Sequence, residues 1–138
     1  MAECRLRVEL LAHTPNPLSV IYAAFCQCYH AGFVADMWPK LLEGEISDEK
    51  QAEFVAKVVA SGHVRPIEHV SFTFAVEGVS RALSHQLVRH RIASYSQQSQ
   101  RYVDGSSFDY VLPPAIASLP EARKRFEICM EHIGDAYK

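Results

Sequence analysis

The chain has 138 residues, a length that fits one domain built around a single hydrophobic core. With 49% hydrophobic residues, 22% charged residues, four cysteines and a net charge of −2, it resembles neither a low-complexity chain nor a disulfide scaffold. It lacks both an apolar run of ~18 residues and a signal-peptide core. We therefore expect a cytoplasmic protein without a membrane span.

The first part of the chain predicts a strand followed by a helix. Apolar and charged residues alternate over residues 6–10, which is typical of a half-buried strand. Asn16 and Pro17 have the identities of an N-cap and a first helical residue. An apolar stripe with helical spacing then continues to Gly32, where we expect the helix to end.

The middle of the chain predicts two more helical segments and a second strand. A short helical segment is expected over residues 34–44, interrupted by Pro39. Ser47 has the identity of an N-cap for a helix that ends at Gly62. Residues 70–76 alternate between apolar and other side chains, so we expect a strand there, ended by a glycine at 78.

The last part of the chain predicts two helices separated by an irregular stretch. Ser80 is the expected cap of a helix that runs to about residue 91, and residues 94–102 are expected to form a strand or an extended loop. A loop is expected at Pro113–Pro114, and Ser118 with Glu121 fits a capping box for a final helix. That helix has no stop signal before Lys138, so we expect the chain to be the N-terminal part of a longer protein.

These elements predict a mixed α/β (α+β) fold in one domain over residues 1–138. The expected sheet is small, twisted and mainly antiparallel, with helices flanking it. Cys26 and Cys28 are two residues apart in a predicted helix, and two thiols are too few for a zinc site. We interpret both as buried thiols.

The segment from Gly78 to Val103, called the basic segment below, contains no Asp or Glu. Its four arginines, at positions 81, 89, 91 and 101, give it a formal charge of +4, while the rest of the chain carries −6. A positive segment without internal counter-ions suggests a bound anion. A solvated face is the alternative explanation of the same arginines.

Two parts of the basic segment can bind an anion. On a helix, Gln86 would lie beside Arg89 and His90. On an extended chain, side chains 97, 99 and 101 would share one face, where a guanidinium and a hydroxyl form a plausible phosphate clamp. The backbone N–H groups of residues 98 and 100 could bind a base edge or a phosphate.

Other roles are less well supported by the sequence. Ser99 lacks the Gly-x-Ser-x-Gly context of a nucleophile, and His85 and His90 could be structural. His63 and His69 do not have the His-Glu-x-x-His spacing of zinc proteases, so no metal site is predicted.

Arg89-His90-Arg91, followed by Ser94, Ser99 and Arg101, resembles the signature of flavin-dependent thymidylate synthases, Arg-His-Arg-x-x-Ser-x-Asn-x-x-Ser-x-Arg. The resemblance extends over about residues 60–104 and includes the Ser-Gly-His at 61–63 and the Phe-Thr-Phe at 72–74. The chain departs from the signature at Ser96, where the family has Asn, and at Arg65, where the family often has Ser or Thr.

The resemblance implies a reaction and its cofactors. The family methylates dUMP to dTMP, taking the carbon from methylenetetrahydrofolate and the hydride from FAD that NADPH has reduced. The resemblance also implies a homotetramer with active sites at subunit interfaces, and a further segment that completes the site, so that the fragment alone could be inactive. No enzyme thiolate is needed, which agrees with cysteines that all lie outside the motif.

The resemblance assigns site residues by matching motif positions. Arg101 is the candidate for stabilising charge on the uracil ring. The nucleotide would be held by Gln86, Leu87, Val88, Arg89, Gln97, Gln98, Ser99, Gln100 and Arg101. FAD would be contacted by His63, Arg65, Arg89, His90, Arg91 and Gln97.

Two other functions stay open at this point. A nucleic-acid-binding module could use the strip Arg89–Tyr102 to hold phosphates and stack bases, although the resemblance does not favour nucleic acid as a partner. A structural or oligomerisation fragment without activity is the second alternative.

Overall fold

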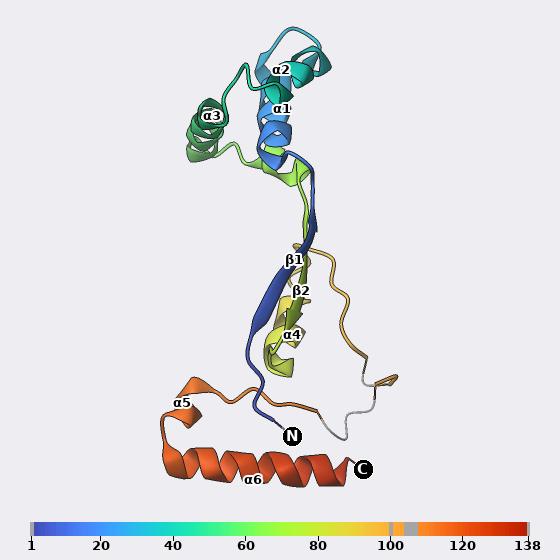
Figure 1. Ribbon diagram of the computed structural model, residues 1–138, viewed down its shortest axis with the longest axis vertical. Coiled ribbons are helices and arrows are strands. Elements are labelled where there is room, and N and C mark those ends of the chain that lie inside the picture. Colours follow the sequence, from blue (N-terminus) through green and yellow to red (C-terminus); the bar gives the residue numbers. More distant parts are fainter. Residues whose placement is uncertain (1, 100, 104–107, 138) are drawn as a thin grey trace. The chain divides into compact units, whose positions relative to one another are not determined.

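The computed structural model describes residues 2–99, 101–103 and 108–137 (Figure 1). Contacts divide the chain into two units. Unit 1 comprises Met1–Glu9 and Val76–Lys138, and unit 2 comprises Leu10–Ala75. The prediction of a single domain over residues 1–138 is not tested by this division and stays a prediction.

The sheet consists of two antiparallel strands, β1 (Arg7–His13) and β2 (Phe72–Glu77), which lie side by side in Figure 1. Arg7 forms an ion pair with Glu77 at 3.3 Å, and the amide of Thr14 donates to the carbonyl of Ser71, so the strands run in opposite directions. With six α-helices in the described residues, this sheet confirms the predicted α+β class.

The prediction that the first strand is half buried was wrong. Every residue of β1 and β2 is exposed, including Leu10 and Phe72, each with half of its surface open. Alternation identified the strand correctly, but it cannot tell whether the same chain supplies a cover for the apolar face. Nothing in the described residues buries that face.

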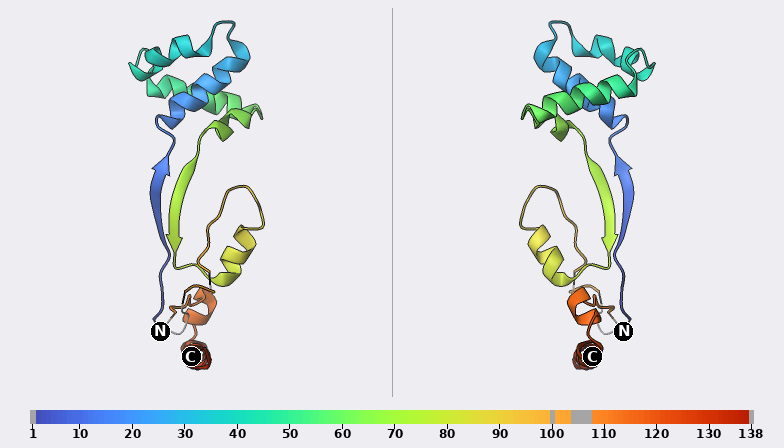
Figure 2. Two further views of the ribbon diagram at one scale, coloured as in Figure 1. Left: turned by 90° about the vertical axis from the view of Figure 1, so that its right-hand side faces the viewer. Right: turned by 90° about the vertical axis from the view of Figure 1, so that its left-hand side faces the viewer.

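Unit 2 has a small core around the first helix, α1 (Pro17–Tyr29). Phe25 of α1 is fully buried and packs edge-to-face against Phe54 of α3 (Asp48–Ala60), with ring centroids 6.2 Å apart. The remaining elements of the unit are η1 (Val34–Met37), α2 (Trp38–Leu42) and η2 (Arg65–His69). Figure 2 shows α1 and α3 crossing each other, which is how Phe25 becomes enclosed.

Helices α1 and α3 of unit 2 begin at the residues that the sequence predicts. Asn16 is the N-cap of α1, in a left-handed conformation and without a side-chain cap, and Pro17 follows at the first position. Ser47 caps α3 by accepting a hydrogen bond from the amide of Lys50. α1 ends at Tyr29 rather than at Gly32. α2 begins at Trp38, so Pro39 lies in its first turn rather than interrupting a helix.

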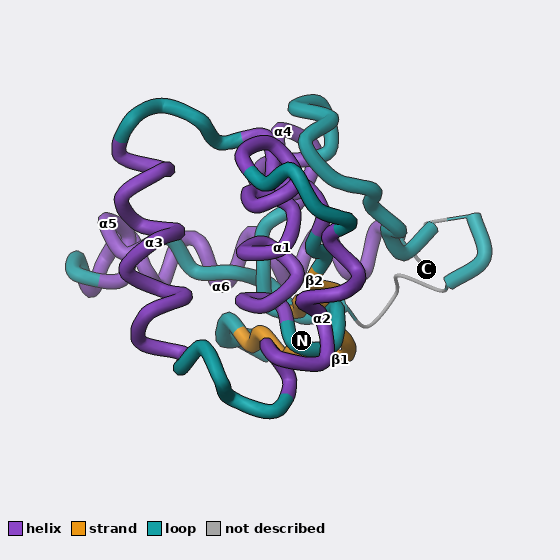
Figure 3. The backbone as a smooth tube through the Cα atoms, turned by 90° about the horizontal axis from the view of Figure 1, so that it is seen from above, coloured by secondary structure: helices purple, strands orange, loops and turns teal. Residues whose placement is uncertain are grey.

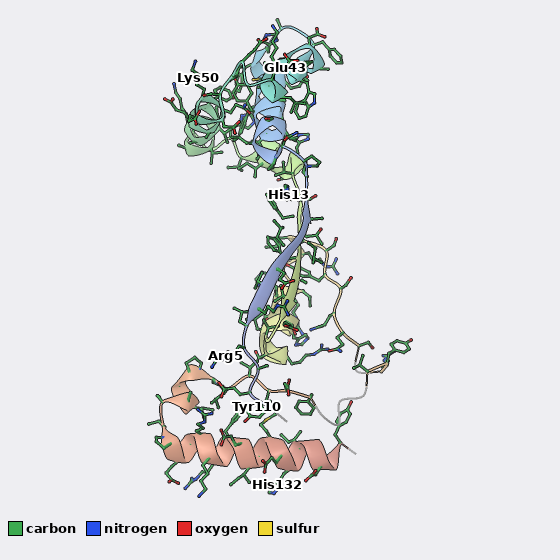
Figure 4. The ribbon with its side chains drawn as sticks, viewed as in Figure 1. Arg5, His13, Glu43, Lys50, Tyr110 and His132 are labelled. Carbon is green, nitrogen blue, oxygen red and sulfur yellow. The ribbon has the colours of Figure 1, made fainter. Side chains whose placement is uncertain are left out.

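Unit 1 contains α4 (Arg81–Leu87), α5 (Pro114–Ala117) and α6 (Pro120–Ala136). The ring of Tyr110, labelled in Figure 4, packs on Phe126 of α6 with centroids 5.7 Å apart. Leu112, two residues after Tyr110 in the sequence, is buried. None of the helices in the described ranges is long and apolar enough to cross a bilayer.

The predicted capping box of the last helix was wrong. The N-cap of α6 is Leu119, with no side-chain cap, and Pro120 begins the helix. The hydroxyl of Ser118 instead donates to the carbonyl of Ala115 at the end of α5, a short helix that the two prolines did not suggest. A proline at the first helical position fixes the start of α6 one residue later than a Ser118 cap would.

Candidate active site

The first part of the basic segment forms α4. As predicted, the Ser80 hydroxyl caps it, accepting from the amide of Leu83 at 3.1 Å. The helix ends at Leu87, however, and the amides of Arg89 and His90 take carbonyl partners three residues back. The prediction of a helix to residue 91 was therefore wrong for its last turn. Arg91 has φ 53°, a left-handed conformation that terminates a helix and is uncommon for a residue with a side chain.

Arg89 contacts His85, a partner that the sequence analysis did not predict. Its Nη2 lies 2.8 Å from Nε2 of His85, one helical turn earlier. Because a guanidinium has only donors, Nε2 of His85 is the acceptor in this hydrogen bond. The expected neighbours Gln86 and His90 are exposed, and Gln86 receives the Arg89 amide through its carbonyl oxygen.

The chain that leaves α4 forms an arch and runs back alongside the helix (Figure 2). Figure 3 draws this segment as a loop. Among the described residues, a side-chain hydrogen bond joins the returning chain to the helix: Nε2 of Gln97 donates to the hydroxyl oxygen of Ser84 at 2.5 Å. Gln97 is thereby brought to α4, which ends two residues before Arg89. The two parts of the basic segment, separate in the sequence, meet in unit 1.

The second part of the basic segment is a loop that closes into a turn. Residues 94–99 form no strand, so the loop alternative was the correct one. The hydroxyl of Ser99 accepts from the amide of Arg101 at 3.2 Å, and the carbonyl of Ser99 accepts from the amides of Tyr102 and Val103. Side chains 97, 99 and 101 therefore do not alternate as on a strand. Gln98 is exposed in this loop, and Gln100 lies outside the described residues.

The arginines of the basic segment have no acidic partners within the part of the chain that the structure describes. The ion pairs there join Arg7 to Glu9 and Glu77, and Arg123 to Glu3 and Glu127. Arg81, Arg89, Arg91 and Arg101 are all exposed. An unneutralised, solvated guanidinium can form bidentate hydrogen bonds with phosphate without first breaking an ion pair.

His63 belongs to unit 2, between α3 and η2. Its Nδ1 lies 3.0 Å from the hydroxyl of Tyr29, and its ring packs edge-to-face on Phe25 with centroids 5.4 Å apart. Gly62, with φ 89°, makes the turn before it. Arg65 is the first residue of η2 and is exposed. His63 and Arg65 thus belong to unit 2, whereas the candidate residues of the basic segment belong to unit 1.

The cysteines divide into two kinds. Cys26 is buried, as predicted, and burial raises the pKa of its thiol, which disfavours the nucleophilic thiolate. Cys28 is exposed, so the prediction that both are buried was wrong: on a helix the two residues lie about 200° apart around the axis. Within the described ranges, no group of three His, Cys, Asp or Glu side chains could hold a metal ion.

The motif and its surroundings match a known family. The family model described as thymidylate synthase complementing protein matches residues 9–138. The chain belongs to this family. Curated relatives named flavin-dependent thymidylate synthase agree with the resemblance in the motif, and they include proteins 74% identical from Nitratidesulfovibrio vulgaris, 49% from Clostridium tetani and 42% from Geobacter sulfurreducens.

Each of these three alignments covers 96% of the chain but only 54%, 51% and 56% of the respective relative. The chain thus spans about half the length of the curated thymidylate synthases that it matches.

Three side chains that contact candidate site residues were not predicted as parts of the site. Ser84 holds Gln97, His85 contacts Arg89, and Tyr29 bonds His63. The four-residue spacing of His85 and Arg89 on a helix could have indicated their contact. No sequence signal linked Ser84 to Gln97 or Tyr29 to His63, because both contacts depend on how the chain folds back.

Proposed function

We propose that the whole protein converts dUMP to dTMP, taking the carbon from methylenetetrahydrofolate and the hydride from FAD reduced by NADPH. Support comes from the relatives, which are named flavin-dependent thymidylate synthases, and from the motif residues themselves. The observation that carries the proposal is the hydrogen bond from Gln97 to Ser84, which joins the loop of the motif to α4 in a segment whose arginines form no ion pair within the described residues.

In this proposal the nucleotide lies against the end of α4 and the loop that returns to it. The phosphate is the anion that the basic segment suggests, and Arg101 with the hydroxyl of Ser99 supplies donors for it or for the uracil. Negative charge develops on the uracil ring during methylation, and a cationic guanidinium would stabilise that charge. Residues 86–89 and 97–101 are the proposed nucleotide contacts, as the motif assigns them.

The donor chemistry around Arg89, His90 and Arg91 fits FAD. A pyrophosphate requires cationic or N–H donors, and the described residues place no carboxylate in an ion pair with either arginine. When bound and reduced, the flavin supplies the hydride. His63 and Arg65 are proposed flavin contacts supplied by unit 2, and Gln97 is a proposed contact shared with the nucleotide.

The assembly and location stay proposals as well. We propose a homotetramer, for which the exposed apolar side chains of β1 and β2 provide support, since such a face is usually covered by another surface. The predicted cytoplasmic location is retained as a prediction.

The flavin test separates this function from its alternatives. We expect the protein expressed from its complete native gene to be yellow, or to become so with added FAD, with absorption bands of oxidised flavin. A nucleic-acid-binding module would instead stay colourless and bind oligonucleotides with an affinity that falls steeply with salt. A structural fragment would stay colourless and bind no oligonucleotide. Absence of flavin bands after FAD addition would count against the enzyme.

Removal of the α1 thiols should leave methyl transfer intact. We expect Cys26→Ala and Cys28→Ala enzymes to form dTMP at wild-type rates, because the proposed chemistry needs no enzyme thiolate. Cys26→Ala removes a buried sulfur and should cost about 1 kcal/mol of stability, whereas the exposed Cys28 should cost less. Chromatographic measurement of dTMP and thermal denaturation check both points. A folded variant that cannot form dTMP would refute the thiol-free route.

A further inference from the structure

The side chain of His63 is held on two sides within unit 2. The Tyr29 hydroxyl lies 3.0 Å from Nδ1, and the His63 ring packs on both the Phe25 and Tyr29 rings, at interplanar angles of 87° and 78°. Phe25 is fully buried, so it provides a fixed surface for the imidazole. The described residues make no hydrogen bond to Nε2.

The direction of the Tyr29–His63 hydrogen bond follows from the acidity of the two groups. A phenolic O–H is a strong hydrogen-bond donor, and the unprotonated nitrogen of a neutral imidazole is a better acceptor than a phenol oxygen. Tyr29 therefore donates to Nδ1. A neutral imidazole that accepts at Nδ1 carries its proton on Nε2, and Nε2–H is left as a donor for a ligand.

We propose that Tyr29 is a positioning residue that fixes the tautomer and orientation of His63, so that Nε2–H donates to an oxygen or nitrogen acceptor on the bound flavin. This inference rests on the proposed function, which assigns His63 to the flavin. The inference gives a role to Tyr29, which lies outside the motif on α1. The apolar stripe of α1, taken alone, would assign Tyr29 to packing. Tyr29 itself is 68% exposed, which is unusual for a side chain whose only role is core packing.

Tyr29→Phe isolates the hydroxyl, because the aromatic ring remains. Tyr22→Phe is the matched control: Tyr22 is on the same helix and packs on Phe54, with centroids 5.0 Å apart, rather than on His63. Both variants are made in the protein expressed from its complete native gene. The histidine ¹⁵N spectrum, recorded over a pH series, reports the tautomer of the neutral ring, with the His63 signals identified by their loss in His63→Gln.

We expect wild type and Tyr22→Phe to show His63 mainly as the Nε2–H tautomer in the flavin-free protein, and Tyr29→Phe to show a mixture. We also expect Tyr29→Phe to raise the Kd for FAD about 5–20-fold, the range for loss of one oriented hydrogen bond, and Tyr22→Phe to leave it unchanged. An unchanged tautomer and Kd in Tyr29→Phe would overturn the inference, as would a changed tautomer with unchanged Kd. If wild type bound no FAD, the proposed function would fail, whereas a tautomer change in Tyr29→Phe would still support the positioning of His63.

Discussion

Gly78→Ala should lower the free energy of unfolding by about 3–5 kcal/mol, among the largest effects of a single substitution. Gly78 ends β2 with φ 70°, where an alanine costs about 1–2 kcal/mol through backbone strain alone. In addition, a Cβ at this position would lie 1.9 Å from the carbonyl oxygen of Arg5 and 2.8 Å from the amide nitrogen of Leu6. Both atoms belong to the backbone, so no side-chain rotation relieves the clash.

Gly44→Ala is the matched control for this prediction. Gly44 has a similar φ of 78°, but a Cβ there would meet nothing within 4 Å. It should therefore lose only the strain of about 1–2 kcal/mol. Urea denaturation of both variants measures the difference. Equal losses would show that the chain near Arg5 moves aside at little cost and that the close approach to Gly78 does not constrain unit 1.

Local signals in the sequence predicted the elements well where one residue type decides the structure. Ser47 and Ser80 cap their helices because a hydroxyl acceptor is needed there. Gly78 ends its strand because the backbone there adopts a positive φ, which glycine allows without strain. Local signals failed where two of them competed. Ser118 had the identity of a cap, but Pro120 determined the start of α6 and left Ser118 to the end of α5.

The candidate site was predictable as a list of residues but not as a set of contacts. The motif identified Arg89, Gln97 and Arg101 because residue types at fixed spacing are visible in one dimension. The hydrogen bond between Gln97 and Ser84 joins residues thirteen positions apart through an irregular loop, for which no periodicity exists. The left-handed Arg91 is also invisible to helix propensity, which favours arginine in a helix.

Arg101→Ala should weaken dUMP binding by about 1.5–3 kcal/mol, or roughly 10- to 150-fold in Kd, the range for a hydrogen bond to a charged group. Arg101 is exposed and forms no ion pair in the described ranges, so the wild-type protein loses no internal contact of that side chain when the nucleotide binds. Its backbone amide is held by the Ser99 hydroxyl, and that contact survives truncation of the side chain. The substitution therefore tests the guanidinium rather than the fold of the turn.

The control for Arg101→Ala must remove the same charge elsewhere. Arg125→Ala does so on the exposed surface of α6, away from the motif in sequence. If general electrostatic attraction explains nucleotide binding, both variants should lose affinity by similar small amounts and the loss should vanish at high salt. If Arg101 binds the nucleotide directly, calorimetry with the protein expressed from its complete gene should show the large loss for Arg101→Ala alone, with much of it remaining at high salt. Wild-type affinity in Arg101→Ala would show that the proposed clamp is misplaced.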